Sequence, residues 1–276
     1  TMQLWIQPLE RFGSLLQFVT GSRDHNVRVR ELAQKRSLSL SEHGFLREDG
    51  SEILCATEED VYRELGLVWI PPELREDRGE VRAALAGRLP ELIGESDRIS
   101  ELHSHSTWSD GVASIEEMAR AAIERGLKVL AISDHSSGLG VAGGLTVERL
   151  REQRAEIEAV QQRLGDQILL LQGAEVEILA DGSLDFGDEV LGQLDIVTAS
   201  LHSSLRQPRD VITARLLRAI NNPHVDVIGH PTGRLLPNRE GADLDMEAVL
   251  KAAQESGTAL EINASPYRLD LDESYA

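Results

Sequence analysis

The sequence of 276 residues predicts an α/β protein with a small α+β domain over residues 1–95, including a linker, and a larger β/α domain over residues 96–276. Two observations support this division. From residue 99 onward, continuous apolar runs alternate with amphipathic segments of helical periodicity, a pattern typical of parallel strands covered by helices. Before residue 95 the predicted elements are shorter and mixed in type. The alternation is compatible with a closed barrel and with an open doubly wound sheet.

The first domain is expected to combine short helices with a hairpin. Asp49-Gly50 is a typical turn dipeptide, Thr57 is a good N-cap, and Gly66 follows the last apolar residue of that helix. The predicted elements are a strand over 2–6, helices over 12–18, 25–36 and 58–65, a hairpin over 38–53, an extended segment over 68–77 and a charged helix over 79–93.

The second domain is expected to alternate strands and helices throughout. Ser114 and Glu117 have the spacing of a capping box, which marks a helix start. The predicted strands span 99–103, 128–135, 168–178, 195–202, 225–230 and 258–264, and the predicted helices span 114–125, 146–164, 211–221 and 246–256.

Composition excludes several classes of function. A net charge of −19 repels a phosphate backbone, so contact with nucleic acid requires a local basic patch or a segment absent from this chain. The single cysteine, Cys55, excludes an internal disulfide and favours a reducing compartment. The chain shows no secretory signal, and its apolar runs are too short to span a membrane. We therefore expect a soluble, cytoplasmic protein without a membrane partner, and the start at Thr1 suggests a piece of a longer polypeptide.

Metal-binding residue types fall at the ends of successive predicted strands. The carboxyl ends of parallel strands meet on one face, so residues far apart in sequence are expected to share one cleft. Imidazole and carboxylate together suit zinc, manganese or iron, and the lack of clustered thiolates argues against a structural zinc site. The residues at these ends are His103, His105, His135, Glu175, Glu177, His202 and His230, with Asp110 shortly after the first strand.

A structural interpretation competes with the metal interpretation for each residue taken alone. A single histidine at a strand end is commonly a hydrogen-bonded boundary residue, which is the expected role of His224. The isolated pair His103-x-His105 is equally compatible with both interpretations. Five histidines and a glutamate at consecutive strand ends favour a metal site. Glu177 stays open: it could join Glu175, cap its strand or pair with an arginine.

The motifs HSHSTWSDG, ISDHS, QGAEVEI, SLHSS and GHPTGR, in this order, resemble the PHP (polymerase and histidinol phosphatase) domain family. The resemblance covers residue 99 to the end and implies a distorted (βα)7 barrel with up to three divalent metal ions. The family ends on a D-x-H motif that this sequence does not reach, so the metal built on Glu175, His202 and His230 should suffer least. Matching motifs place the family's ligands on His103, His105, Asp110, His135, Glu175, His202 and His230.

Within the first hundred residues, the motifs QFVTGSRDHNVRVRELAQKR, EEDVYRELG and WIPPELRE resemble the thumb of bacterial family X DNA polymerases, in which a PHP domain follows the thumb. This resemblance implies that Asn26 and Arg30, four positions apart on one helix face, contact DNA. It also implies upstream polymerase domains in the same polypeptide. Gln3 stands where the family has a catalytic aspartate, which argues against polymerisation by this chain.

The resulting expectation is a metal-dependent phosphodiesterase, a 3′-to-5′ exonuclease that trims DNA at ends and gaps during repair. His103, His105 and Glu175 would carry catalysis through metal ions, with manganese the favoured activator and zinc or iron the alternatives. Arg234 is the expected phosphate-gripping residue, and a structural salt bridge is its alternative role. Two other functions stay open: a non-catalytic module that positions the thumb on DNA, and a small-molecule phosphomonoesterase similar to histidinol phosphatase.

Overall fold

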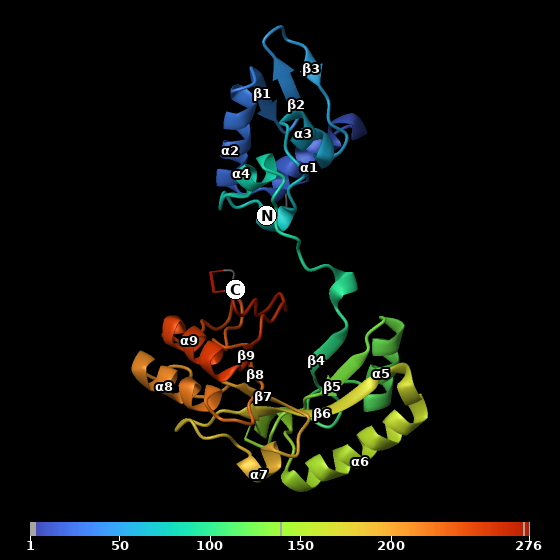
Figure 1. Ribbon diagram of the computed structural model, residues 1–276, viewed down its shortest axis with the longest axis vertical. Helices are drawn as coiled ribbons and strands as arrows, with labels where there is room; N and C mark the ends of the chain where they lie inside the picture. Colours follow the sequence, from blue (N-terminus) through green and yellow to red (C-terminus); the bar gives the residue numbers. More distant parts are fainter. Residues whose placement is uncertain (1–3, 139, 273, 276) are drawn as a thin grey trace. The chain divides into compact units, whose positions relative to one another are not determined.

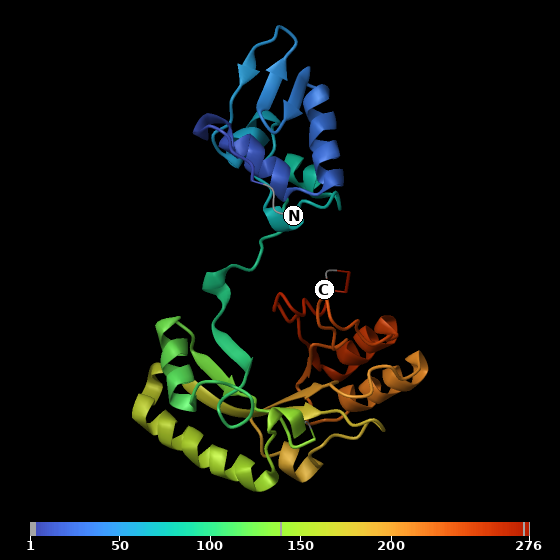
Figure 2. The same ribbon diagram turned by 180° about the vertical axis from the view of Figure 1, so that it is seen from behind.

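Two structural units share the chain, Thr1–Ile93 and Gly94–Ala276, and each has a hydrophobic core of its own (Figures 1 and 2). The computed structural model describes residues 4–138, 140–272 and 274–275. Among these, no helix combines the length and the apolar character needed to cross a membrane.

The first unit packs helices against a small antiparallel sheet. Its strands β1 (Leu38–Ser41), β2 (Gly44–Arg47) and β3 (Glu52–Ile53) pair in sequence order. Val29, Phe45, Val61 and Leu65 are almost fully buried between the sheet and the helices. The helices are α1 (Phe12–Thr20), α2 (Arg23–Gln34), α3 (Glu58–Glu64) and α4 (Glu80–Leu85), with short 3-10 turns at Leu9–Arg11 and Pro72–Leu74.

Most of the elements predicted for the first unit occur close to their predicted positions, but two of the predicted elements were wrong. Thr57 caps α3, as the sequence predicted, and the structure adds a reciprocal capping box with Asp60. Of the strand predicted over 2–6, the structure describes residues 4–6, and these do not form a strand. They are exposed and pair with no strand among the described residues. The helix predicted over 79–93 ends at Leu85, because Gly87 takes a left-handed conformation with φ 62° and Pro90 follows.

The second unit is built on a parallel sheet with the strand order β4-β5-β6-β7-β8-β9 over the described residues. The sheet is curled, and its helices lie along its outer side (Figures 1 and 2). The predicted α/β class with a parallel sheet is therefore confirmed. The strands are β4 (Ser100–Ser104), β5 (Val129–Ile132), β6 (Leu169–Glu177), β7 (Ile196–Ser200), β8 (Val227–Gly229) and β9 (Ala259–Leu260).

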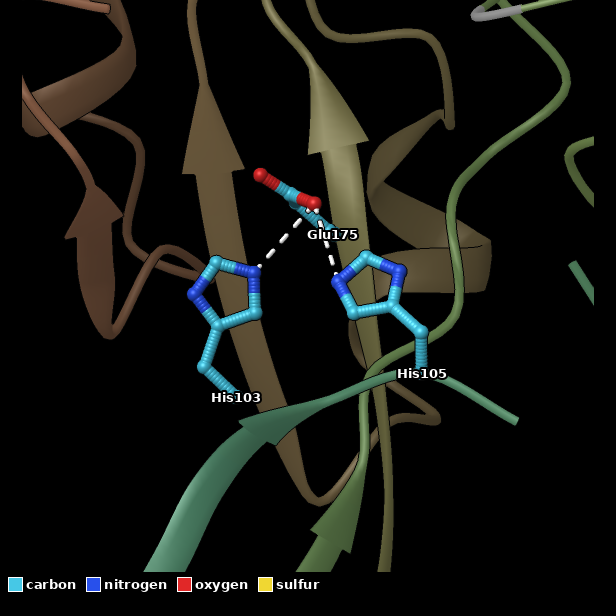
Figure 3. A group of neighbouring side chains, drawn as sticks. All are labelled: His103, His105 and Glu175. Atoms are coloured by element: carbon cyan, nitrogen blue, oxygen red, sulfur yellow. Dashed lines mark ion pairs between the residues drawn. The ribbon is translucent and has the colours of Figure 1, made fainter. Parts of the chain in front are cut away.

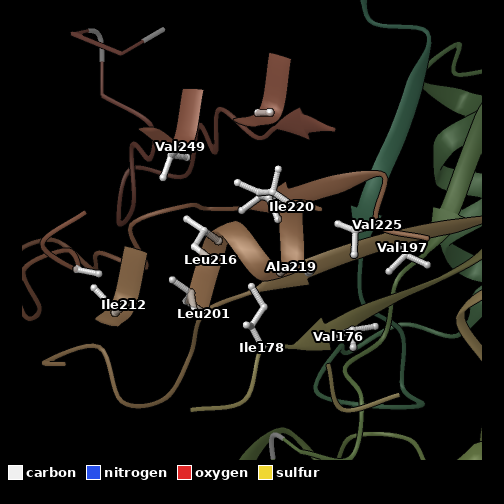
Figure 4. Close-up of a cluster of buried hydrophobic side chains, with 14 of the residues drawn as sticks. Val176, Ile178, Val197, Leu201, Ile212, Leu216, Ala219, Ile220, Val225 and Val249 are labelled. Atoms are coloured by element: carbon white, nitrogen blue, oxygen red, sulfur yellow. The ribbon is translucent and has the colours of Figure 1, made fainter. Parts of the chain in front are cut away.

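Helices and sheet enclose the larger core. Leu201 and Val197 from the β7 region belong to the same buried cluster as the helix residues Leu216 and Ile220, and Figure 4 shows part of this cluster. The apolar runs of the strands are continuous because a parallel strand in this fold is buried on both faces. The helices are α5 (Ile115–Glu124), α6 (Val147–Leu164), α7 (Asp188–Leu191), α8 (Arg209–Ile220) and α9 (Met246–Ser256), with 3-10 turns at Glu95–Asp97, Gly140–Ala142 and Gly165–Gln167.

Candidate metal centre

Five imidazoles form a closed ring at the carboxyl ends of the parallel strands. Neighbouring ring centroids lie 4.4 to 5.9 Å apart all the way round. Only His103 and His105 are close in sequence; every other neighbouring pair joins histidines far apart in the sequence, so the curled sheet brings the strand ends together. The ring contains, in order, His103, His105, His135, His202 and His230.

The carboxylate of Glu175, on β6, lies at the centre of this ring. Each of the five rings brings one nitrogen to within 3.3 Å of a Glu175 oxygen. His230 Nε2 approaches Oε1 to 2.9 Å, and Figure 3 shows His103 and His105 meeting Oε2. The Glu175 side chain is only 2% exposed, so an anion is buried here and depends on its neighbours for stabilisation.

Asp110 is brought to the rim of the ring by a hydrogen-bonded loop. Its Oδ1 lies 3.0 Å from His105 Nδ1, and its Oδ2 lies 3.6 Å from His135 Nε2. The buried Asp134 holds the loop, because its carboxylate accepts from Ser106 N at 2.8 Å and Ser106 Oγ at 2.6 Å. The loop thus places a second carboxylate beside two imidazoles.

Charge is tightly balanced around Glu175. Burial raises the pKa of Glu175, but the surrounding imidazoles outweigh burial and hold this pKa well below its ordinary value. Burial lowers the pKa of His103, but the carboxylates of Glu175 and Glu261 prevail and raise it to about 10. Burial lowers the pKa of His135 to about 4, and the rings of His105 and His202 act in the same direction. The centre therefore favours positive charge next to Glu175.

The residues fit divalent cations. Four buried atoms of the ring have no hydrogen-bond partner: Nδ1 of His105, His135 and His230, and Oε1 of Glu175. Nδ1 of His105 and Nδ1 of His135 approach carboxylate oxygens within ion-pair distance, yet their orientation is unsuitable for hydrogen bonds, as expected of lone pairs that point at a cation. Three groups have ligand atoms within 4.8 Å of one another: His103–His105–Glu175, His105–Asp110–His135 and His135–Glu175–His202. His230 joins none of these groups, although it contacts Glu175.

Two glutamates outside the ring orient its histidines. Glu177 Oε2 lies 2.7 Å from His202 Nδ1, and its other oxygen accepts from Ser203 N at 3.1 Å. Arg215 NH2 lies 3.7 Å from Glu177 Oε1, so the arginine pairing left open from the sequence exists alongside the histidine contact. Such carboxylate contacts hold the ring nitrogens that face away from a metal.

Glu261 plays the same part on the other side and was missed from the sequence. Its Oε1 lies 2.9 Å from His103 Nδ1, and its Oε2 accepts from the backbone N–H of His230 at 2.5 Å. His230 has a φ of 28°, in the left-handed region, and this contact helps to hold that strained backbone. The available signal was its position, as an acid inside the last predicted strand, 258–264.

A cavity of about 680 Å³ opens over the ring. Arg234 is not among its lining residues. Its Nε donates to Arg268 O at 2.7 Å, another guanidinium nitrogen donates to Leu269 O, and NH1 lies 3.6 Å from Asp272 Oδ2. The phosphate-gripping role of Arg234 stays a prediction, and the structure gives this side chain a salt bridge and two backbone contacts.

The predicted DNA-contacting residues lie on α2 of the first unit, and Gln3 lies outside the described residues. The amide nitrogen of Asn26 donates to Phe18 O and Gly21 O at 2.9 and 3.1 Å, and its oxygen accepts from Gln17 at 2.9 Å. Arg30 is half-buried, with its guanidinium carbon 5.4 Å from the centre of the Phe18 ring. Asn26 therefore holds the turn between α1 and α2, and its DNA contact stays a prediction.

Comparisons with known proteins match two separate parts of the chain to two families. The family described as "DNA polymerase beta thumb" matches residues 15–76, and the family described as "PHP domain" matches residues 101–265. A Bacillus subtilis protein named "DNA polymerase/3'-5' exonuclease PolX" is 46% identical over 263 residues, which cover 95% of this chain and 46% of that protein. The chain thus spans about half the length of this relative.

Smaller proteins resemble the second unit. A "probable phosphatase" of Thermoanaerobacter is 37% identical over 176 residues, 61% of this chain and 66% of the relative. A solved histidinol phosphate phosphatase from Lactococcus lactis, complexed with zinc, L-histidinol and phosphate, is 20% identical with a TM-score of 0.42, covering 60% of this chain and 73% of that chain.

Proposed function

Because this chain belongs to the PHP domain family and carries a polymerase-type thumb before that domain, we propose that it hydrolyses phosphodiester bonds in DNA with divalent cations. The observation that carries the proposal is the ring of five imidazoles around the buried Glu175 carboxylate. The name of the Bacillus relative supports 3′-to-5′ exonuclease activity as the finer assignment. A cytoplasmic location belongs to the same proposal, and a role in DNA repair supports it.

His103, His105, Asp110 and Glu175 would hold cations at the open side of the ring, and His135, His202 and His230 would complete their coordination. A divalent cation supplies Lewis acidity there, which activates water and offsets negative charge on phosphoryl oxygens. Glu177 and Glu261 fix the imidazoles, so the nitrogens facing the cavity keep their lone pairs for cations. Manganese is the proposed activating ion, since histidine and carboxylate donors accept it.

The activity test uses the full chain loaded with Mn²⁺ and an oligonucleotide labelled at its 5′ end. A ladder that shortens from the 3′ end is the expected result. His103→Ala and Glu175→Gln should each reduce the rate by at least about 100-fold, the loss typical of a weakened metal site. His224→Gln is the matched control, because His224 belongs to the same unit but lies outside the ring.

Absence of cleavage by Mn²⁺-loaded protein would leave the non-catalytic module as the better function. Cleavage that survives in both His103→Ala and Glu175→Gln would identify a contaminating nuclease.

A phosphomonoesterase is the second candidate, favoured by the phosphatase relative. The attached thumb argues for DNA instead, since a small-molecule phosphatase has no use for it. Rates on the oligonucleotide and on a small phosphomonoester, measured with one preparation, decide between the two substrates. Faster turnover of the monoester at equal concentration would favour the second candidate.

The thumb and the upstream polymerase domains of the same polypeptide are the proposed partners in placing DNA ends and gaps near the ring. Arg30→Ala should weaken binding of a gapped duplex and reduce the salt slope of the affinity by about 1. Fluorescence anisotropy over a salt series measures both quantities, with Arg47→Ala on β2 as the control. An unchanged slope in Arg30→Ala would remove Arg30 from the DNA interface.

A further inference from the structure

Two arginines line the cavity above the ring. Arg239 comes from the loop after β8, and Arg268 comes from the segment after β9. Both are half-buried, and they share the cavity wall with Asn263 and Leu235. The cavity therefore has guanidinium groups in its wall as well as the imidazole ring.

Neither arginine has a carboxylate partner among the described residues. Arg239 donates from Nε to Gly233 O at 2.9 Å, and Arg268 donates from NH1 to Arg234 O at 3.4 Å. The neighbouring Arg206 pairs with Glu240 at 3.5 Å.

The surroundings of Arg239 are positive rather than negative. Burial lowers the pKa of Arg239, and the guanidiniums of Arg268 and Arg206 lower it further. Cations that lie together at a cavity wall without an ion-pair partner of their own are stabilised when an anion enters. A phosphate oxygen pair matches the planar fork of a guanidinium and accepts two parallel hydrogen bonds from it.

Arg234, by contrast, already has partners within the protein. Its guanidinium contacts two backbone carbonyls and Asp272, and it does not line the cavity. It positions the segment that carries Arg268, because both of those carbonyls belong to residues 268–269.

We propose that Arg239 and Arg268 form the phosphate-binding clamp of the cavity and hold a phosphate group of the substrate against the ring. This inference rests on the proposed function and names the residues that would recognise its substrate. The shared chemistry is a phosphate ester, either an internal phosphodiester of a DNA strand or a terminal phosphomonoester.

The test measures binding by titration calorimetry, with thymidine 5′-monophosphate and a short oligothymidylate as probes. The full chain is measured both loaded with Mn²⁺ and after chelation, which separates the arginines from the ions. Arg239→Gln and Arg268→Gln should each weaken binding of at least one probe about tenfold or more in both states, as expected for lost charge-assisted hydrogen bonds. The probe more strongly affected identifies the monoester or the diester as the ligand.

Two kinds of control accompany these variants. Arg209→Gln removes the same charge from α8, where Arg209 is exposed and lies outside the cavity lining, and should change affinity less than about twofold. Arg239→Lys and Arg268→Lys keep the charge but lose the fork, so they should restore only part of the affinity. Manganese content per chain and the unfolding temperature should equal those of the wild type in all variants.

The outcomes separate this inference from the proposed function. Arginine-dependent binding by a protein that hydrolyses neither substrate would end the proposed function and leave the clamp in place. Wild-type affinity in both glutamine variants would overturn the clamp, even if the protein cleaves DNA. A loss of affinity accompanied by lost manganese or a lowered unfolding temperature would assign the arginines a structural role and likewise overturn it.

Discussion

Glu261 joins the two edges of the curled parallel sheet through His103: their side chains meet at 2.9 Å although 158 positions separate them in the sequence. His103 lies on the edge strand β4, and Glu261 directly follows β9 at the other edge. Over the described residues β4 and β9 do not pair through their backbones. A side chain therefore links the ends of the sheet, and the same link orients a histidine of the ring.

Replacement of this link should weaken both the metal centre and the fold. Glu261→Gln keeps the shape but removes the charge that faces His103 and His230. We expect a lower manganese content per chain by elemental analysis and a loss of about 1–3 kcal/mol in the free energy of unfolding. Glu255→Gln on α9 is the control, because that carboxylate is exposed. Normal metal content and stability in Glu261→Gln would show that the link is dispensable.

The hydrogen bonds that Asp134 accepts should order only the loop that carries Asp110, and not the rest of the ring. Asp134→Asn places an amide donor against the donors of Ser106 and Gln153, which now give their hydrogens to the carboxylate. We expect faster amide hydrogen exchange over residues 106–111, with partial rather than complete loss of manganese. Exchange measured by mass spectrometry tests this, and protection equal to the wild type in that loop would contradict it.

The first unit should lose stability as the pH falls below 6.5. His25 is fully buried, with Nδ1 2.7 Å from Glu80 Oε1 and Nε2 3.1 Å from Tyr62 Oη. Burial lowers the pKa of His25 from 6.5, and Arg75 adds to this, although Glu80 and Asp77 oppose it.

The unfolded chain therefore takes up the proton first, so His25 contributes its stability above pH 6.5 and loses it as the pH falls towards the lowered pKa. Hydrogen exchange of α2 as a function of pH, compared between wild type and His25→Gln, isolates this contribution. Parallel pH profiles of the two proteins would refute it.

The core of the second unit should tolerate truncation poorly. Leu216 on α8 is fully buried among the residues of Figure 4. Leu216→Ala is expected to cost about 2–5 kcal/mol of unfolding free energy, the range for buried large-to-small changes. Leu169, which is 52% exposed, provides the comparison, since Leu169→Ala should change stability by less than about 0.5 kcal/mol. Urea unfolding monitored by circular dichroism measures both, and equal costs for the two variants would disprove the packing described for Leu216.

Much of the fold was predictable because it depends on local patterns. Apolar runs located the strands of the second unit, and the capping box at Ser114 located the start of α5 as the structure has it. The two errors have different causes: the helix predicted over 79–93 ends early at the local signals Gly87 and Pro90, whereas the strand predicted over 2–6 needed a tertiary partner. Residues 4–6 have an apolar character suited to a strand, yet no described strand pairs with them.

By itself, the amino-acid order determined which residue types stand at the ends of the strands, and parallel pairing then required those ends to meet. Only the tertiary structure decided which side chains face each other across the curled sheet. It placed Glu175 inside the ring, assigned Glu177 and Glu261 to support the histidines, and turned Arg239 and Arg268 towards the cavity while Arg234 was occupied by backbone carbonyls. The position of a strand follows from the hydrophobic pattern of a short stretch of sequence. The partners of a side chain depend instead on the curvature of the sheet and on loops far apart in the sequence.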